Sequence, residues 1–171
     1  MKKVLLVDRD GTIIVEPTNA DKSPNGVAYQ VDSLDQLEFL PKAVESLKVL
    51  QDAGFVLIMV TNQNGIGSEK FPENDFWVPQ NAMMEMLKEA GVNFEEVFIC
   101  PHFKEDNCNC RKPKTGMVDD YLANHDIDLE SSYMIGDRDT DLEFAQNIGV
   151  KGLKLDENYL WDDVVKTILY K

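Results

Sequence analysis

The sequence predicts an α/β protein in which helices cover both faces of a parallel sheet. The apolar run at residues 4–7 has the length and composition of a strand that is buried on both faces, residues 55–60 predict a second buried strand, and residues 97–100 predict a third strand. The short apolar run at residues 133–135 and the segment GLKL at residues 152–155 predict a fourth and a fifth strand. Segments with helical apolar spacing separate the runs, and this alternation is typical of parallel strands joined by right-handed crossovers.

The first half of the chain alternates between strand, loop and helix. Residues 16–40 are polar and contain Pro, Asn, Ser and Gly, which indicates a loop or irregular hairpin too short to form a separate cap domain. Pro41 suits the first position of a helix, and Gly54 is expected to end it. The apolar residues between them follow at helical spacing: Ala43, Val44, Leu47 and Leu50.

A second helix is predicted after the strand at residues 55–60. Residues 63–78 contain Gly and Pro and predict a long loop, which leaves a helix from about residue 79 to residue 90. The methionines of this helix are interpreted as core residues rather than as a functional face. Three of its side chains are expected to face inward: Met83, Met86 and Leu87.

The remaining elements are expected in the same alternation. A polar loop at residues 101–114 follows the third strand. Periodicity then predicts helices at about 115–124 and 139–147 around the fourth strand, and an amphipathic helix at 161–169 after the fifth.

Length and charge limit the classes of function. The 171 residues suit one domain, predicted at residues 1–171, and no run reaches the ~18 apolar residues of a membrane span. A net charge of −14 argues against nucleic acid and anionic membrane as partners. A cytosolic protein is therefore expected, and an anionic substrate would need local positive charge to bind.

Two acids stand at the end of the first predicted strand. Asp8 and Asp10 are two residues apart and can face one pocket, because side chains alternate along an extended chain. Gly11 then allows the chain to turn, and ligands bind at the carboxyl ends of strands in open α/β sheets. The alternative is an ordinary turn rich in Asp and Gly.

The other strand ends also carry polar residues. Each has a simpler explanation by itself, as a turn cap, a solvated lysine or an acid in the first turn of a helix. Their joint order favours one site. The residues are Thr61 and Asn62 after the second strand, Arg111 and Lys112 in the loop after the third, and Asp137 and Asp141 after the fourth.

These four ordered groups resemble the motifs of the haloacid-dehalogenase-like phosphatases, whose first motif, DxDGT, matches residues 8–12. The resemblance covers essentially the whole chain. It implies a Rossmann-like, doubly wound sheet with strand order 3-2-1-4-5 and no large cap domain. It also implies a Mg²⁺-dependent phosphomonoesterase that forms an aspartyl-phosphate.

The resemblance assigns a role to each matched residue. Asp8 would be the nucleophile, and Asp10 would be the general acid and then the general base. Mg²⁺ would be held by the carboxylates of Asp8 and Asp137 and by the backbone carbonyl of Asp10. Asp141 would orient Lys112 or a metal-bound water.

Four further groups would bind the phosphoryl oxygens. The Thr61 hydroxyl and the Asn62 backbone N–H can donate to them. Lys112 would neutralise charge in the transition state, and Arg111 can add a forked contact.

A cysteine cluster follows the third predicted strand. Cys100, His102, Cys108 and Cys110 form the pattern C-x-H-x5-C-x-C, and four thiolate and imidazole ligands suit a closed, structural Zn²⁺ site. Zinc would pin the loop at residues 100–110 and so hold the basic residues that follow directly. The alternative is a chance grouping of small cysteines with a surface histidine.

Within the family, the segment TNQNGIG at residues 61–67 and VEP at residues 15–17 resemble the histidinol-phosphate phosphatase branch. In that branch the glutamate that matches Glu16 helps to hold the substrate amine; the alternative is a solvated acid. The expected reaction is hydrolysis of L-histidinol phosphate in histidine biosynthesis. Some members are fused to an imidazoleglycerol-phosphate dehydratase, so a fused or separate dehydratase is the implied protein partner.

Three other functions remain open from the sequence. The nearest is a D-glycero-D-manno-heptose 1,7-bisphosphate phosphatase or another small-metabolite phosphatase with the same chemistry. A receiver-like signalling domain and a non-catalytic zinc-binding module belong to different classes. The sequence leaves the role of residues 17–40 open, and it does not decide between a monomer and a dimer.

Overall fold

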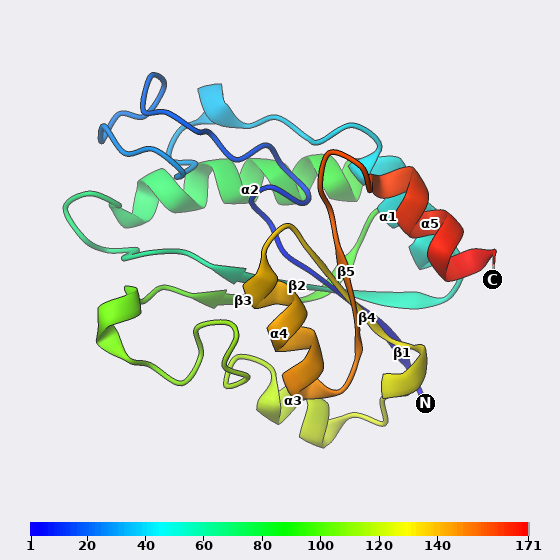
Figure 1. Ribbon diagram of the computed structural model, residues 1–171. Coiled ribbons are helices and arrows are strands. Elements are labelled where there is room, and N and C mark those ends of the chain that lie inside the picture. Colours follow the sequence, from blue (N-terminus) through cyan, green and yellow to red (C-terminus); the bar gives the residue numbers. More distant parts are fainter. Residues whose placement is uncertain (171) are drawn as a thin grey trace.

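The computed structural model describes residues 1–170 and contains a central parallel sheet between two layers of helices (Figure 1). Lys171, the last residue of the predicted domain, lies outside the described residues. The sheet order is β3-β2-β1-β4-β5, as predicted. The strands are β1 (Lys3–Val7), β2 (Phe55–Asn62), β3 (Phe94–Cys100), β4 (Tyr133–Gly136) and β5 (Lys151–Lys154).

Helices cover the sheet on both sides. α1, α2 and α5 lie on one face, and α3 and α4 lie on the other (Figure 1). The helices are α1 (Ala43–Asp52), α2 (Glu73–Glu89), α3 (Asp119–Asn124), α4 (Asp139–Ile148) and α5 (Trp161–Leu169). Short 3₁₀ turns form at Leu34–Gln36, Lys104–Asp106 and Leu129–Ser131.

The central strand β1 supplies both hydrophobic cores. Leu5 and Val7 pack into the core beneath α1, α2 and α5, whereas Val4 and Leu6 pack into the core beneath α3 and α4. All four side chains are fully buried, which explains the uninterrupted apolar run. Because β1 is also the central strand, its end lies between the ends of β2 and β4.

The predicted start of α2 was wrong. The helix begins at Glu73 rather than near residue 79, and Pro79 lies inside it. Phe76 explains the longer helix, because its fully buried ring packs edge-on against Phe71, with ring centroids 5.8 Å apart. This packing outweighs the one backbone hydrogen bond that Pro79 cannot donate.

The inward face of α2 also corrects one core prediction. Phe76, Gln80, Met83 and Leu87 are buried at helical spacing and define the face that packs on the sheet. Met86 lies outside that face and its residue is 47% exposed, so the prediction that it faces inward was wrong.

Other boundaries differ by a few residues. α1 begins at Ala43 because Lys42 has a left-handed backbone, with φ 66°, which places Pro41 before the helix. Thr115 and its neighbours form turns, and α3 starts only at Asp119. Residues 16–40 are largely irregular, as predicted, apart from the turn at Leu34–Gln36. Within residues 1–170 no helix combines the length and apolarity required to cross a membrane.

Candidate active site

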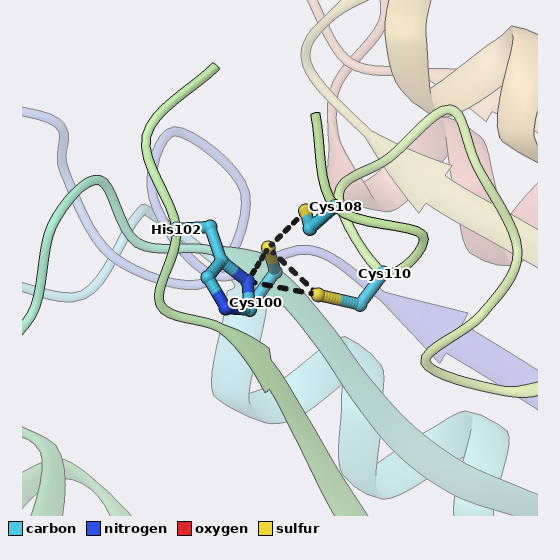
Figure 2. A group of neighbouring side chains, drawn as sticks. All are labelled: Cys100, His102, Cys108 and Cys110. Carbon is cyan, nitrogen blue, oxygen red and sulfur yellow. Dashed lines mark hydrogen bonds between the residues drawn. The ribbon is translucent and has the colours of Figure 1, made fainter. Parts of the chain in front are cut away.

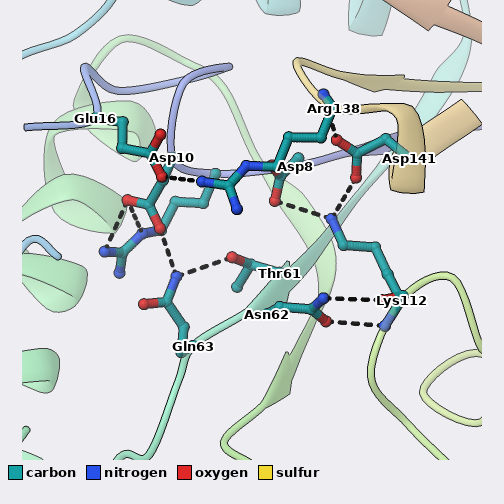
Figure 3. Close-up of polar contacts among 10 residues, drawn as sticks. Asp8, Asp10, Glu16, Thr61, Asn62, Gln63, Lys112, Arg138 and Asp141 are labelled. Atoms are coloured by element: carbon teal, nitrogen blue, oxygen red, sulfur yellow. Dashed lines mark hydrogen bonds and ion pairs between the residues drawn. The ribbon is translucent and has the colours of Figure 1, made fainter. Parts of the chain in front are cut away.

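Lys112 connects the ends of two central strands. Its buried ammonium donates to Asp8 Oδ1 at 2.9 Å and to Asp141 Oδ1 at 2.7 Å (Figure 3). Asp8 directly follows β1, Asp141 lies in the first turn of α4, and Lys112 comes from the loop after β3. The structure therefore brings together three of the predicted site residues from distant parts of the chain.

Burial sets the electrostatics of this group. Burial raises the pKa of Asp8 to about 6 despite the neighbouring Lys112 ammonium. Burial and the Asp8 charge raise the pKa of Asp137 to about 7. Burial opposes the charged form of Lys112, but Asp8 and Asp141 outweigh it and raise the lysine pKa. The site is thus rich in carboxylates, and the Lys112 ammonium stays protonated among them.

Asn62 holds the backbone that carries Lys112. Its side-chain Nδ2 donates to the Lys112 carbonyl at 3.1 Å, and its Oδ1 accepts from the Lys112 N–H at 2.9 Å. This pair of bonds fixes the loop after β3 against the end of β2. The sequence suggested only a backbone contact from Asn62 to a phosphoryl oxygen, so this side-chain contact was missed.

Thr61 and Asp10 share a neighbour that the sequence reasoning did not single out. Gln63 Nε2 donates to Asp10 Oδ2 at 2.6 Å and to Thr61 Oγ1 at 2.9 Å (Figure 3). A pattern signal existed, since Thr61 and Gln63 are two residues apart at a strand end and can face the same side. Arg9 contacts the other carboxylate oxygen of Asp10.

Asp137 lies beside the turn at Gly11. A Cβ atom at Gly11 would lie 2.2 Å from Asp137 Oδ2, and Gly11 has φ 74°, so only glycine fits there. The buried Asp137 Oδ1 has no hydrogen-bond partner among the described residues. Such an orphaned carboxylate oxygen suits a hard cation that binds oxygen ligands.

The carboxylates around Asp137 meet the needs of such a cation. Asp8, Asp137 and Asp141 each offer an oxygen within 4.8 Å of the others. Asp141 is already engaged, because Oδ1 accepts from Lys112 and Oδ2 accepts from the Arg138 N–H at 3.1 Å. Asp8 and Asp137 are therefore the carboxylates with free capacity for a metal ion.

Two predicted ligands of the substrate, Glu16 and Arg111, already have protein partners. Glu16 forms an ion pair with Arg138, which the sequence reasoning missed, and burial raises the Glu16 pKa (Figure 3). Arg111 donates to Asn64 Oδ1 at 2.5 Å and to the His102 carbonyl at 3.4 Å. Arg111 therefore contacts the loop that carries the cysteine cluster, and Glu16 faces the site near Asp10 and Asp8.

The four residues Cys100, His102, Cys108 and Cys110, here called the cysteine cluster, converge in one loop (Figure 2). The Cys100 sulfur lies 3.2 Å from that of Cys110 and 3.6 Å from that of Cys108, and His102 Nδ1 lies 3.2 Å from the Cys110 sulfur. Tetrahedral zinc with Zn–S bonds of about 2.3 Å would hold its ligand atoms at nearly these separations. The cluster could bind zinc.

Comparison with known proteins agrees with this geometry. A family model described as HAD-hydrolase-like matches residues 109–156, which include Lys112, Asp137 and Asp141. A solved structure, the D,D-heptose 1,7-bisphosphate phosphatase of B. bronchiseptica complexed with magnesium and phosphate, is 26% identical with a TM-score of 0.76. The match covers 99% of both chains. The chain thus matches the haloacid-dehalogenase-like hydrolases over residues 109–156 and is similar over its whole length to a phosphatase structure.

The sequence relatives are more specific. The chain is 46% identical to the histidine biosynthesis bifunctional protein HisB of Legionella pneumophila (strain Lens), over 99% of this chain and 46% of the relative. It is 43% identical to the HisB of Blochmanniella floridana, over 98% of this chain and 45% of the relative. The chain thus spans about half the length of the curated relatives it matches.

Proposed function

We propose that this chain is a phosphomonoesterase that hydrolyses L-histidinol phosphate to L-histidinol and phosphate, a step of histidine biosynthesis. The carrying observation is the Lys112 ammonium held between Asp8 and Asp141 beside the orphaned Asp137 oxygen. A carboxylate nucleophile, a fixed cation and free metal-binding capacity in one buried site suit phosphoryl transfer. The relatives named for histidine biosynthesis support the choice of substrate.

Asp8 is the proposed nucleophile. Its carboxylate oxygen forms a bond to phosphorus while the bond from phosphorus to the substrate oxygen breaks, which gives an aspartyl-phosphate. Lys112 lies 2.9 Å from Asp8 Oδ1, fixes the carboxylate and offsets the charge that gathers on the phosphoryl oxygens. Asp141 holds Lys112 in this position.

Asp10 is the proposed general acid and base. It gives a proton to the leaving oxygen in the first step and takes a proton from the attacking water in the second. Thr61 and the backbone N–H of Asn62 are proposed to donate to the phosphoryl oxygens. Thr61 Oγ1 accepts from Gln63, which leaves its own hydroxyl hydrogen free to donate.

Mg²⁺ fits the free oxygens of the site. We assign it the carboxylates of Asp8 and Asp137 and the backbone carbonyl of Asp10. When bound, Mg²⁺ would screen the repulsion between the Asp8 carboxylate and an anionic phosphate. The magnesium in the heptose-bisphosphate phosphatase structure supports this assignment.

Zn²⁺ is proposed as a structural ion in the cysteine cluster. Its four ligands leave no open position for a substrate. The ion would hold the loop that leads directly into Arg111 and Lys112. Arg111 contributes to the same rigidity by bonding the His102 carbonyl, and this contact favours a supporting role over direct phosphate binding.

Glu16 is the proposed contact for the substrate ammonium. Its carboxylate is partly buried near Asp8 and Asp10 and is paired with Arg138. An acid at this place suits an aminoalkyl phosphate better than a polyol phosphate. A heptose 1,7-bisphosphate phosphatase is the second candidate because a solved protein of that name matches the whole chain.

The setting of the reaction is also a proposal. The bifunctional relatives suggest a dehydratase, fused or separate, as the functional partner. We place the protein in the cytosol, which agrees with three cysteines that form no disulfide in the described residues. We also propose one catalytic domain over residues 1–171. The acidic surface makes nucleic acid and membranes unsuitable partners.

A substrate panel tests the proposal. We expect the highest kcat/KM with L-histidinol phosphate in the presence of Mg²⁺, and a far lower value with the heptose bisphosphate. Preference for the heptose ester would transfer the assignment to the second candidate. Absence of phosphate release from every ester would reject a phosphatase and favour a zinc-binding module.

A further inference from the structure

Donors occupy both carboxylate oxygens of Asp10. Arg9 contacts Oδ1 through Nε at 3.2 Å and through Nη2 at 3.1 Å, and Gln63 Nε2 donates to Oδ2 at 2.6 Å. Rotation of the carboxylate would break both sets of contacts. The plane of the Asp10 carboxylate is therefore fixed before any substrate binds.

Arg9 is itself held in place by α2. Its side chain is fully buried, Nη1 donates to Gln80 Oε1 at 3.0 Å, and the guanidinium lies 5.0 Å from the centroid of the Phe76 ring. A buried guanidinium is costly unless its charge and its N–H groups are matched. Asp10 compensates the charge, Gln80 accepts from Nη1 and Phe76 packs near the guanidinium, although the buried Nη2 makes an ion pair with Asp10 and no hydrogen bond. These contacts connect the acid to α2.

Gln63 connects the acid to the phosphate-binding end of β2. Its Nε2 donates to Thr61 Oγ1 at 2.9 Å as well as to Asp10, and the side chain is buried. One amide group therefore sets the distance between the proposed acid and the proposed phosphate ligand. Lys112 holds the proposed nucleophile Asp8 in the same way, so Asp8 and Asp10 are held by different side chains.

We propose that Arg9 and Gln63 are positioning residues for Asp10, and that Gln80 acts on Asp10 through Arg9. This inference rests on the proposed function, because it deepens the role given there to Asp10. Proton transfer to a leaving oxygen depends steeply on the placement of the acid. The three side chains supply that placement without touching the substrate.

A cycle of variants tests the inference. Gln63→Leu removes the donor to Asp10 Oδ2 and is expected to lower kcat/KM for the phosphate ester by about 10-fold to 10²-fold, as for other misplaced catalytic groups. In the Asp10→Asn background the same substitution should cost less than about twofold, because coupled residues are not additive. The same loss in both backgrounds would overturn the inference.

Gln80→Leu extends the cycle to α2. We expect a smaller loss than for Gln63→Leu that again disappears in the Asp10→Asn background, and a loss that persists there would remove Gln80 from the assignment. Arg9→Lys keeps the positive charge but removes the planar guanidinium with its paired N–H groups, and Arg9→Met removes both. Only Arg9→Lys should therefore retain part of the rate. If a leucine variant fails to fold, Gln63→Asn and Gln80→Asn, whose shorter side chains withdraw the same groups, replace it in the cycle.

Gln36→Leu is the matched control. Gln36 is also a buried glutamine, and its side chain bonds the backbone of Asp32, Ser33 and Gln30 in the loop before α1. Its substitution should lower stability without a loss of kcat/KM that depends on Asp10. A control that behaved like Gln63→Leu would overturn the inference, since general loosening would then explain both.

The cycle also separates this inference from the proposed function. If Asp10→Asn retains the wild-type rate, the proposed acid–base role fails and the inference falls with it. If Asp10→Asn is slow and the effects of Gln63→Leu are additive to it, the function stands and only the positioning role is overturned.

Discussion

The acid site and the cysteine cluster are assembled in different ways. The acid site joins Asp8, Asp137, Asp141 and Lys112, and the Lys112–Asp8 contact spans 104 residues of sequence. The cysteine cluster joins Cys100, the last residue of β3, to three residues of the loop that follows it. The acid site therefore depends on several strands of the sheet, whereas the cluster needs only the end of one strand and the loop after it.

Solvent exposure separates the two regions further. The Lys112 side chain is only 3% exposed, as is that of Asp141, so their charges are compensated inside the protein. In the cluster only Cys100 is buried, and Cys108 and Cys110 are partly exposed. Burial keeps the charged groups of the acid site paired with one another, whereas partial exposure allows an ion to enter the cysteine cluster. The following experiments test whether the two regions are as different as this comparison suggests.

Asp8→Asn should have the largest effect on the acid site. We expect turnover of the phosphate ester to disappear, because an amide cannot form the aspartyl-phosphate. The fold should survive, since Asn keeps an oxygen that accepts from Lys112 and Asp141 keeps its own bond to that ammonium. Phosphate release and circular dichroism measure the two outcomes. Retained activity would exclude Asp8 as the nucleophile.

Asp10→Asn should slow turnover without abolishing it. Loss of a general acid and base typically costs about 10² to 10⁴-fold in rate. The cysteine cluster should keep its metal content, because Asp10 contacts Arg9 and Gln63 and no member of the cluster. Steady-state kinetics and metal analysis check both statements, and a wild-type rate would contradict the role given to Asp10.

The sequence predicted the parts of each region that depend on local pattern. Alternating strands and helices predicted the parallel sheet, and the family resemblance implied its strand order. The four ordered motifs pointed to Asp8, Lys112, Asp137 and Asp141, which the structure brings together. The spacing of three cysteines and a histidine was enough to predict the cluster. The strands, helices and cysteine cluster follow from periodicity and spacing, which a sequence displays directly, whereas the strand order and the site came from the family resemblance.

Contacts set by packing could not be predicted in the same way. The early start of α2 follows from the burial of Phe76, which outweighs Pro79. Arg9 stands between two acids, where strand alternation would point it away from them, yet it contacts Asp10. The Glu16–Arg138 pair joins residues 122 apart, and nothing local links them. Such contacts are decided by tertiary geometry after the elements have formed.

Cys108→Ser tests how far the cysteine cluster supports the acid site. The wild-type protein should contain about one zinc ion per chain, from four ligands in one site. The variant should lose that zinc and lose about 10-fold in kcat/KM, because a loosened loop would misplace Lys112, and even a small misplacement of a catalytic group slows the reaction. Metal analysis and kinetics measure the two quantities.

Lys104→Ala is the control for the same loop. Its residue is exposed in the 3₁₀ turn Lys104–Asp106 and contributes no ligand atom to the cluster. This variant should retain both zinc and activity. A zinc-free wild-type protein with an ordered loop would contradict the structural role of the ion.

The smallest effect concerns the dependence of stability on pH in magnesium-free buffer. Burial raises the pKa of Asp8 to about 6 and that of Asp137 to about 7, so the folded chain holds protons that the unfolded chain has already released. The stabilising contribution is full near pH 4 and is lost as the pH rises towards 7. We therefore expect this contribution to the free energy of unfolding to fall over that interval, and Asp137→Asn should flatten the fall. Denaturant titrations at several pH values measure it.

Added Mg²⁺ should restore stability mainly at the high-pH end, because a cation binds the deprotonated carboxylates. An equal gain at pH 4 and pH 7 would show that the ion does not bind at the acid site.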